Sequence, residues 1–333
     1  MANNRRVAYF DLLNVISCFG VVCLHSNGYV HSFIKDSWWW LRVFVEVLFY
    51  FAVPVFFMLS GATLMTYRER YSTAQFIQKR FMKAVFPFLF WGVLFIIIKL
   101  FLDFSSISPG GIIMSFTTGK IPYTNYWFFI PLFVLYVFIP FVSLMVVRLT
   151  YRQMTWLIAI MILFQSFLPA MYSIFGLEFK VSIPLGGYFI YALLGYYIAT
   201  FDIEKNDKLC FAIYLIAIIS MLIRYWLLYL SNEKEPMLFT YFGLYAIFPA
   251  CAVFLLFKRC SISSCRLQNF FTYLAKRSYG IFLIHTFLIF LLSNVISKDN
   301  PWFIPLSVFL VYSISLVIVS ILQKGRWTRY IVP

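Results

Sequence analysis

The chain is dominated by long apolar runs that are separated by short polar segments. A helix needs about 20 apolar residues to cross the hydrocarbon core of a bilayer, and most of the runs reach that length. The polar segments 105–111, 231–236 and 298–301 are rich in residues that favour turns. The pattern therefore predicts about ten spanning helices. Their expected positions are residues 7–29, 38–66, 84–102, 124–147, 154–174, 181–200, 208–230, 237–257, 279–297 and 303–323.

The N-terminal run resembles a signal peptide, because Arg5 and Arg6 precede it. However, it contains Asp11, Asn14 and His25, and it ends without a small-residue cleavage site. We therefore expect a retained first helix.

Composition excludes a soluble protein. The chain is 63% apolar and only 12% charged, whereas soluble domains average about 45–50% and about 25%. A hydrophobic chain of this length must satisfy its backbone hydrogen bonds inside lipid. We expect an all-α, polytopic membrane bundle that forms a single transmembrane domain over residues 1–333.

The net charge of +15 bears on orientation and partners. Most Lys and Arg residues fall in loops on one side, which the positive-inside rule assigns to the cytoplasm together with both termini. The expected location is the inner (cytoplasmic) membrane, among membrane lipids. Nucleic acid is not an expected partner, because no basic segment is long enough to follow a phosphate backbone. A homodimer is the simplest oligomer to expect.

The first predicted helix carries a polar stripe. Asp11, Asn14, Cys18 and His25 lie within about 40° of one helical face. Polar groups in a bilayer are costly, so this face should line the bundle interior or a watery cavity. His25 is expected in the outer half of the membrane, where a neutral imidazole can act as a general base. The alternative is a structural histidine that pairs with a neighbouring helix.

The second predicted helix also carries charge. Arg42 and Glu46 are four residues apart and can neutralise each other, and Pro54 should kink the helix. Glu46 is expected at a depth similar to that of His25, because the first two helices are antiparallel. Glu46 can then orient the imidazole or stabilise its charge, as carboxylates do in catalytic triads. The alternative is a purely structural Arg–Glu pair.

A basic cluster precedes the third predicted span. Lys79, Arg80 and Lys83 lie close together, and Arg80 and Lys83 share a helical face. Such a cluster suits a phosphorylated cytosolic ligand. The alternative is ordinary positive-inside charge.

Other polar and aromatic positions are harder to interpret from the sequence. His285 can line the same cavity as His25 or be a satisfied core histidine. Trp127 belongs to an aromatic belt at the outer interface and is a candidate substrate contact. His31 is expected in a solvated external loop, and Arg224 has no partner that the sequence can name. No metal site is expected, because Cys260 and Cys265 share a loop without a histidine nearby.

Six sequence blocks in the same order resemble the membrane-bound acyltransferase 3 family. The resemblance extends from residue 9 to about residue 290. The blocks are YFDLLNVISCFGVVCLHS, VPVFFMLSGATL, FIQKRFMKAVFPFLFW, YWFFIPLFVLYVFIPF, LGYYIA and RSYGIFLIHTFLI.

This resemblance implies a roughly ten-helix O-acyltransferase. Such enzymes move an acyl group, usually acetyl, from cytosolic acyl-CoA to a hydroxyl of a cell-surface polysaccharide or its lipid-linked sugar precursor. His25 matches the family's histidine that is thought to be catalytic. Lys79, Arg80 and Lys83 match its basic motif, which implies a role in binding acetyl-CoA. His285 matches the histidine of the last block.

One position departs from the family pattern. Many members carry Arg eleven positions before the catalytic His, where this chain has Asn14. Asn14 can still hydrogen-bond to the donor, but it supplies no charge. Some members also carry a fused extracytoplasmic domain, for which this chain leaves no room, so we expect direct transfer. The alternative function is a transporter or flippase for a polysaccharide precursor, in which the polar faces line a translocation path.

Overall fold

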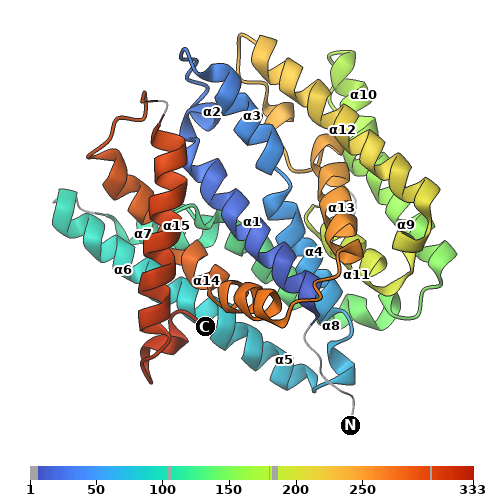
Figure 1. The fold of residues 1–333 in the computed structure, drawn as a ribbon, viewed down its shortest axis with the longest axis horizontal. Helices are drawn as coiled ribbons and strands as arrows, with labels where there is room; N and C mark the ends of the chain where they lie inside the picture. The colour runs from blue at the N-terminus through green and yellow to red at the C-terminus, as the bar shows by residue number, and fades with distance from the viewer. Residues whose placement is uncertain (1–6, 104–106, 180, 182–186, 301) are drawn as a thin grey trace. The chain divides into compact units, whose positions relative to one another are not determined.

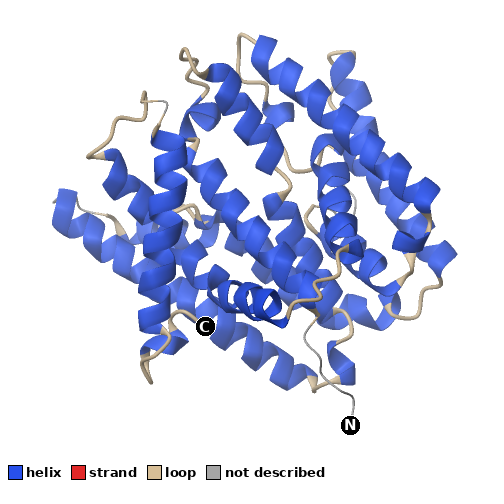
Figure 2. Cartoon of the chain, in the orientation of Figure 1, coloured by secondary structure: helices blue, strands red, loops and turns tan. Residues whose placement is uncertain are grey.

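The computed structural model describes residues 7–103, 107–179, 181, 187–300 and 302–333. All regular structure within these ranges is helical, with no strand (Figures 1 and 2). The α-helices are α1 (Ala8–Ser26), α2 (Gly28–Ser32), α3 (Trp39–Phe49), α4 (Ala52–Leu64), α5 (Thr73–Arg80), α6 (Phe86–Asp103), α7 (Pro109–Thr118), α8 (Phe129–Val146), α9 (Tyr151–Ile162), α10 (Leu168–Ile174), α11 (Phe189–Thr200), α12 (Asp207–Leu230), α13 (Leu244–Arg259), α14 (Cys265–Ser293) and α15 (Phe303–Leu322).

Short turns of other helix types connect or interrupt these helices. Two π-helical turns, η2 (Phe81–Val85) and η4 (Leu163–Phe167), join α5 to α6 and α9 to α10. The 3-10 turns are η1 (Tyr67–Glu69), η3 (Tyr126–Phe128), η5 (Ile203–Lys205), η6 (Pro236–Phe239) and η7 (Thr328–Tyr330).

Nine helical stretches in the described ranges are long and apolar enough to cross a membrane. The prediction of a polytopic helical membrane bundle is therefore confirmed. The expected span 181–200 contains a shorter apolar helix, Phe189–Thr200, and residues 182–186 lie outside the described ranges. The nine stretches are Ala8–Ser26, Trp39–Glu69, Thr73–Leu102, Tyr126–Val146, Tyr151–Ile174, Asp207–Leu230, Pro236–Arg259, Cys265–Ser293 and Phe303–Leu322.

The second span is interrupted where the sequence predicted a kink. Helix α3 ends at Phe49 and α4 begins at Ala52, so the break falls just before Pro54. Proline has no N–H to donate to the carbonyl four residues earlier, and its ring disfavours the preceding helical turn.

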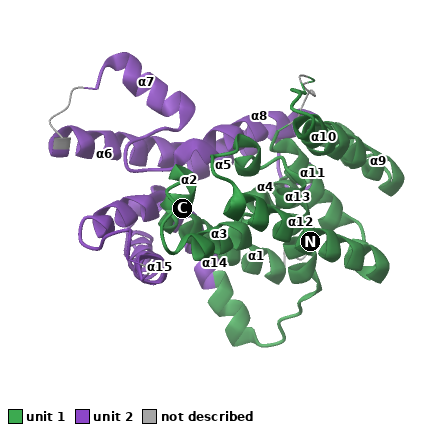
Figure 3. Cartoon of the chain, turned by 90° about the horizontal axis from the view of Figure 1, so that it is seen from above, with its two compact units in different colours: residues 1–66, 142–272 green, residues 67–141, 273–333 purple. Residues whose placement is uncertain are grey.

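The chain divides into two compact units, each of which is described by itself (Figure 3). Unit 1 comprises residues 1–66 and 142–272, and unit 2 comprises residues 67–141 and 273–333. The boundary between 272 and 273 falls inside α14, so one continuous helix belongs to both units. The expected single domain over residues 1–333 stays a prediction.

In unit 1, α4 and α11 approach each other through reciprocal glycines. A Cβ atom at Gly61 would lie 1.8 Å from the backbone oxygen of Ala192, and one at Gly195 would lie 1.9 Å from that of Met58. Only glycine permits such an approach, which is how small residues bring membrane helices together. Helix α4 also packs against α1 and α13, so this contact holds the centre of unit 1.

In unit 2, aromatic side chains tie the helices together by donating to backbone carbonyls. The Tyr126 hydroxyl donates to the oxygen of Leu283 (2.5 Å), and the Tyr279 hydroxyl donates to that of Ala84 (2.9 Å). The Trp91 indole donates to the oxygen of Ile331 (2.9 Å). These bonds satisfy the polar tips of large rings whose bodies lie in an apolar interior.

The glycine contact in unit 1 gives a prediction about stability. Replacing Gly61 or Gly195 with alanine should destabilise the protein by about 1–3 kcal/mol or more, because the added methyl group meets backbone that cannot move aside. Thermal unfolding in detergent would measure the loss.

Gly110→Ala is the matched control for this prediction, because a Cβ there meets no atom within 4 Å. Unfolding of the Gly61 and Gly195 variants at the temperature of the Gly110 variant would contradict the proposed close contact.

Candidate active site

The polar stripe of α1 is largely enclosed by protein. Asp11 and Cys18 are buried, while Asn14 and His25 are half-buried. The Asp11 carboxylate accepts a hydrogen bond from the Thr272 hydroxyl (2.6 Å) within unit 1. The Asn14 side-chain oxygen is buried and makes no hydrogen bond within the described residues. The stripe therefore offers polar atoms in an interior position.

His25 lies one residue before the end of α1, where the chain turns into α2. The turn residue Asn27 is fully buried, and its side-chain amide donates to the backbone oxygen of Arg42 in α3 (2.7 Å). The segment that follows His25 is thus fixed to α3 by a buried hydrogen bond.

The Glu46 carboxylate is fully buried between two basic side chains. Its Oε1 lies 3.3 Å from Nη2 of Arg224, and its Oε2 lies 3.5 Å from Nε2 of His31. The sequence proposed His25 or Arg42 as the neighbour of Glu46. The structure places Arg224 and His31 there, and both come from other helices.

Arg224 is held from several sides. Its Nε donates to the backbone oxygen of Leu238 (3.0 Å), and its guanidinium carbon lies 3.5 Å from the ring centroid of Tyr50. Tyr245 provides a second ring at 4.9 Å, and Tyr50 stacks on Tyr241 with centroids 4.4 Å apart. A buried cation needs such partners because it has lost its water. These contacts favour the structural interpretation of Glu46.

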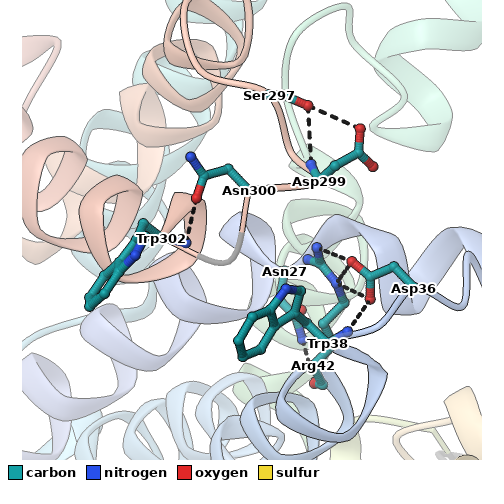
Figure 4. A network of polar contacts seen from close by, with 8 residues as sticks. All are labelled: Asn27, Asp36, Trp38, Arg42, Ser297, Asp299, Asn300 and Trp302. Atoms are coloured by element: carbon teal, nitrogen blue, oxygen red, sulfur yellow. Dashed lines mark hydrogen bonds and ion pairs between the residues drawn. The ribbon is translucent and has the colours of Figure 1, made fainter.

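Arg42 pairs with a different carboxylate, that of Asp36 (Figure 4). Its Nε lies 3.0 and 2.9 Å from the two carboxylate oxygens, and its Nη2 lies 2.6 Å from Oδ2. The guanidinium also covers the ring of Tyr29 at 4.5 Å, and the residue is only 2% exposed. This arrangement favours a structural role for Arg42 over the substrate contact that the sequence suggested.

Figure 4 also shows the loop before α15, which belongs to unit 2. The Ser297 hydroxyl donates to the Asp299 carboxylate (3.0 Å), and the Trp302 N–H donates to the Asn300 side chain (2.9 Å). These local bonds define the turn that leads into α15.

The basic cluster lies where α5 passes into the π-helical turn η2, within unit 2. A capping box of Ser72 and Gln75 fixes the start of α5. Lys79 and Lys83 are exposed, and the Lys79 ammonium lies 3.9 Å from the ring centroid of Tyr71. Arg80 is half-buried. The structure thus keeps three cations together over little more than one helical turn.

His285 and Trp127 are further candidates in unit 2. The His285 Nδ1 lies 2.8 Å from the backbone oxygen of Phe282 and 3.1 Å from that of Ile281. A carbonyl oxygen only accepts a hydrogen bond, so Nδ1 carries the hydrogen. His285 is 1% exposed, and Trp127 is half-buried in η3.

The sequence alone did not identify Arg224 and His31 as the neighbours of Glu46. Arg224 stands in an apolar span, which by itself signals a buried acidic partner. Glu46 was an available acid, but it is 178 positions away, and no local spacing connects the two. His31 was assigned to a solvated loop, and its side chain is indeed 41% exposed, yet its ring faces Glu46.

The candidate residues divide between the two units. Within the described ranges, no three His, Cys, Asp or Glu side chains are grouped so as to hold a metal ion. Unit 1 contains Asn14, His25, Arg42 and Glu46, and unit 2 contains Lys79, Arg80, Lys83, Trp127 and His285.

The fold and these residues define a multi-pass membrane protein with a histidine at the end of a polar helix stripe and a compact basic cluster. Over residues 7–322, nearly the whole chain, the sequence matches the profile of an acyltransferase domain. The chain therefore belongs to the acyltransferase 3 family, and it is a membrane acyltransferase. No curated protein and no solved structure matches it significantly.

The buried ion pair leads to a second stability prediction. Arg224→Met should destabilise unit 1 by about 3–5 kcal/mol, because it leaves the Glu46 charge buried without its main partner. Adding Glu46→Gln to Arg224→Met should recover part of that loss. A double-mutant cycle of thermal unfolding in detergent would measure the coupling.

Lys205→Met provides the control, because it removes an ion pair that lies at the surface. The Lys205 ammonium hydrogen-bonds to Asp202 (2.6 Å) and thereby lowers the pKa of that carboxyl, but both side chains are exposed. If Arg224→Met unfolds like Lys205→Met, the buried pair does not stabilise the fold.

Proposed function

We propose that this acyltransferase takes its acyl group, in the simplest case acetyl, from acyl-CoA. The proposed acceptor is a hydroxyl of a cell-envelope polysaccharide or of its lipid-linked sugar precursor, and the proposed location is the inner membrane. The observation that carries the proposal is the family match over residues 7–322. The donor and acceptor classes come from the resemblance to the family.

The basic cluster is the proposed site for the donor phosphates. Lys79, Arg80 and Lys83 are expected on the cytoplasmic side by the positive-inside rule, where acyl-CoA is found. Their proximity supports this role, since clustered cations bind phosphate oxygens by charge-assisted hydrogen bonds. On α1, the buried oxygen of Asn14 is the proposed acceptor for an amide N–H group of the pantetheine arm.

His25 is the proposed general base at the end of the stripe. It removes the proton from the acceptor hydroxyl as the oxygen attacks the thioester carbonyl. The new C–O bond forms, the C–S bond breaks, and the CoA thiolate leaves and takes up the proton from His25. The half-buried position of His25 supports this role, because it leaves part of the side chain accessible to a substrate.

The remaining predicted residues keep supporting roles in the proposal. Glu46, which contacts His31 and Arg224, acts on His25 only by holding the following helix α2 in place. His285 and Trp127 are the proposed contacts for the acceptor sugar, since imidazole and indole rings can both contact sugars. Arg42 is proposed to support His25, because its backbone oxygen accepts the Asn27 hydrogen bond that fixes the turn after α1.

The role of His25 is tested by substitution. His25→Ala should abolish acyl transfer while the protein stays folded, because no other group would accept the hydroxyl proton. CoA release from acetyl-CoA would be measured with purified protein in lipid nanodiscs, supplied with a cell-envelope glycan fraction. Release should require both the glycan and His25.

Lys208→Ala changes an exposed side chain outside the candidate site and is the control that should retain the activity. Substantial transfer by His25→Ala would remove His25 from the mechanism. Absence of both CoA release and donor binding in the wild-type protein, for any short acyl-CoA, would overturn the proposed function.

The donor site is tested separately. Lys79→Gln combined with Lys83→Gln should raise the KM for acyl-CoA up to roughly tenfold, because solvent-exposed charge pairs contribute about 0.2–1 kcal/mol each and about 1.4 kcal/mol is a factor of ten. The kcat should change much less, since these cations are proposed to bind the donor and not the reacting atoms. Initial-rate kinetics would separate the two constants.

Lys208→Gln changes an exposed cation outside the cluster and should leave the KM unaltered. An equal KM for the cluster variant and this control would place the donor phosphates elsewhere.

A further inference from the structure

A groove of about 390 Å³ lies in unit 2 between α5 with η2 on one side and α8 on the other. Its walls are almost entirely apolar, and aromatic rings from both sides dominate them. We call it the Arg80 groove, and its principal lining residues are Phe76, Arg80, Phe81, Phe133, Tyr136 and Phe141.

Among the residues that the structure describes, Arg80 is the only charged side chain that lines this groove. Its Nε is buried and makes no hydrogen bond within the described residues. The guanidinium carbon lies 5.6 Å from the ring centroid of Tyr136 and 5.8 Å from that of Phe76. A buried cationic donor with unused hydrogen-bonding capacity indicates an anionic partner at this position.

The charged side chains that flank Arg80 in the chain are positive. Lys79 and Lys83 flank Arg80 and are exposed. The sequence contains no Asp or Glu between Arg70 and Leu102, so this stretch supplies no internal counter-ion. The groove therefore opens beside a concentrated positive field that favours a phosphate group.

The edges of the groove are apolar and exposed. Ile77, Val137 and Phe141 are 58%, 65% and 69% exposed, and they lie in the candidate spans Thr73–Leu102 and Tyr126–Val146. In a bilayer such surfaces contact lipid chains. The groove thus combines an apolar surface that can contact an alkyl chain with a cation at one end that can bind a phosphate group.

We propose that the Arg80 groove binds one anionic phospholipid of the membrane. One acyl chain lies along the apolar walls, and a phosphate oxygen accepts a hydrogen bond from the Arg80 Nε. A phospholipid suits this geometry because its chains begin close to its phosphate. In acyl-CoA, by contrast, the whole pantetheine arm separates the acyl group from the phosphates. A lipid phosphate at Arg80 would compete with the donor for this one cation of the cluster.

Native mass spectrometry of the purified full chain in detergent tests the proposal without acyl-CoA. The probes are phosphatidylglycerol, phosphatidylcholine with the same acyl chains, and inorganic phosphate alone. Val137→Trp fills the groove, whereas Val134→Trp adds the same ring at a 52% exposed position of α8 that does not line it. Arg80→Gln removes the charge.

We expect the wild-type protein and Val134→Trp to bind phosphatidylglycerol at least tenfold more tightly than Val137→Trp. Arg80→Gln should bind phosphatidylglycerol no more tightly than phosphatidylcholine. Ile77→Trp blocks the groove from the opposite wall and replaces Val137→Trp if that variant does not fold.

Three results would overturn the proposal. One is equal binding of phosphatidylglycerol by the groove-filled variant and Val134→Trp. Another is equal affinity of the wild-type protein for the two lipids. The third is binding of inorganic phosphate that excludes phosphatidylglycerol, since the ligand would then be a soluble phosphate. None of these results bears on acyl transfer, which is measured separately.

Discussion

The buried carboxylate of Glu46 joins three parts of unit 1. It lies on α3, it pairs with Arg224 of α12, and it faces His31 of α2. Removing a charge of either sign from such a pair leaves the other uncompensated in an apolar surrounding. The positions of α2, α3 and α12 are therefore linked. The turn after His25 depends on the same surface of α3, through Asn27 and the backbone of Arg42.

A second constraint is the close approach of α4 and α11 at Gly61 and Gly195. Helices in lipid gain no hydrophobic energy from associating, so they rely on close packing and on interhelical polar contacts. Unit 1 uses both: glycines at the α4–α11 contact and a buried ion pair between α3 and α12. The polar stripe of α1 lies beside this framework, because α1 packs against α3, α4 and α13. A rigid scaffold of this kind fits the general-base role proposed for His25, because a general base must keep its orientation.

The candidate site residues and their partners could be predicted from the sequence to different degrees. His25, Asn14 and the basic cluster could be proposed because they break apolar runs and because they fall in blocks that resemble a family. The partners of the charges could not be found in this way. The i,i+4 spacing of Arg42 and Glu46 suggested a local pair, yet Asp36 neutralises Arg42, and Arg224 neutralises Glu46. Both actual partners lie outside the helix that carries Arg42 and Glu46.

The sequence by itself determined that this is a multi-pass helical membrane acyltransferase, because the length of each apolar run and the order of the motif blocks are properties of the linear chain. The interruption before Pro54 could also be predicted from the sequence, since it follows from the backbone N–H that proline lacks. Only the tertiary structure decided which charges meet, where glycine is required and where a groove opens beside Arg80. These features arise between segments that are distant in the chain, and their geometry depends on how side chains from different helices fill a common interior.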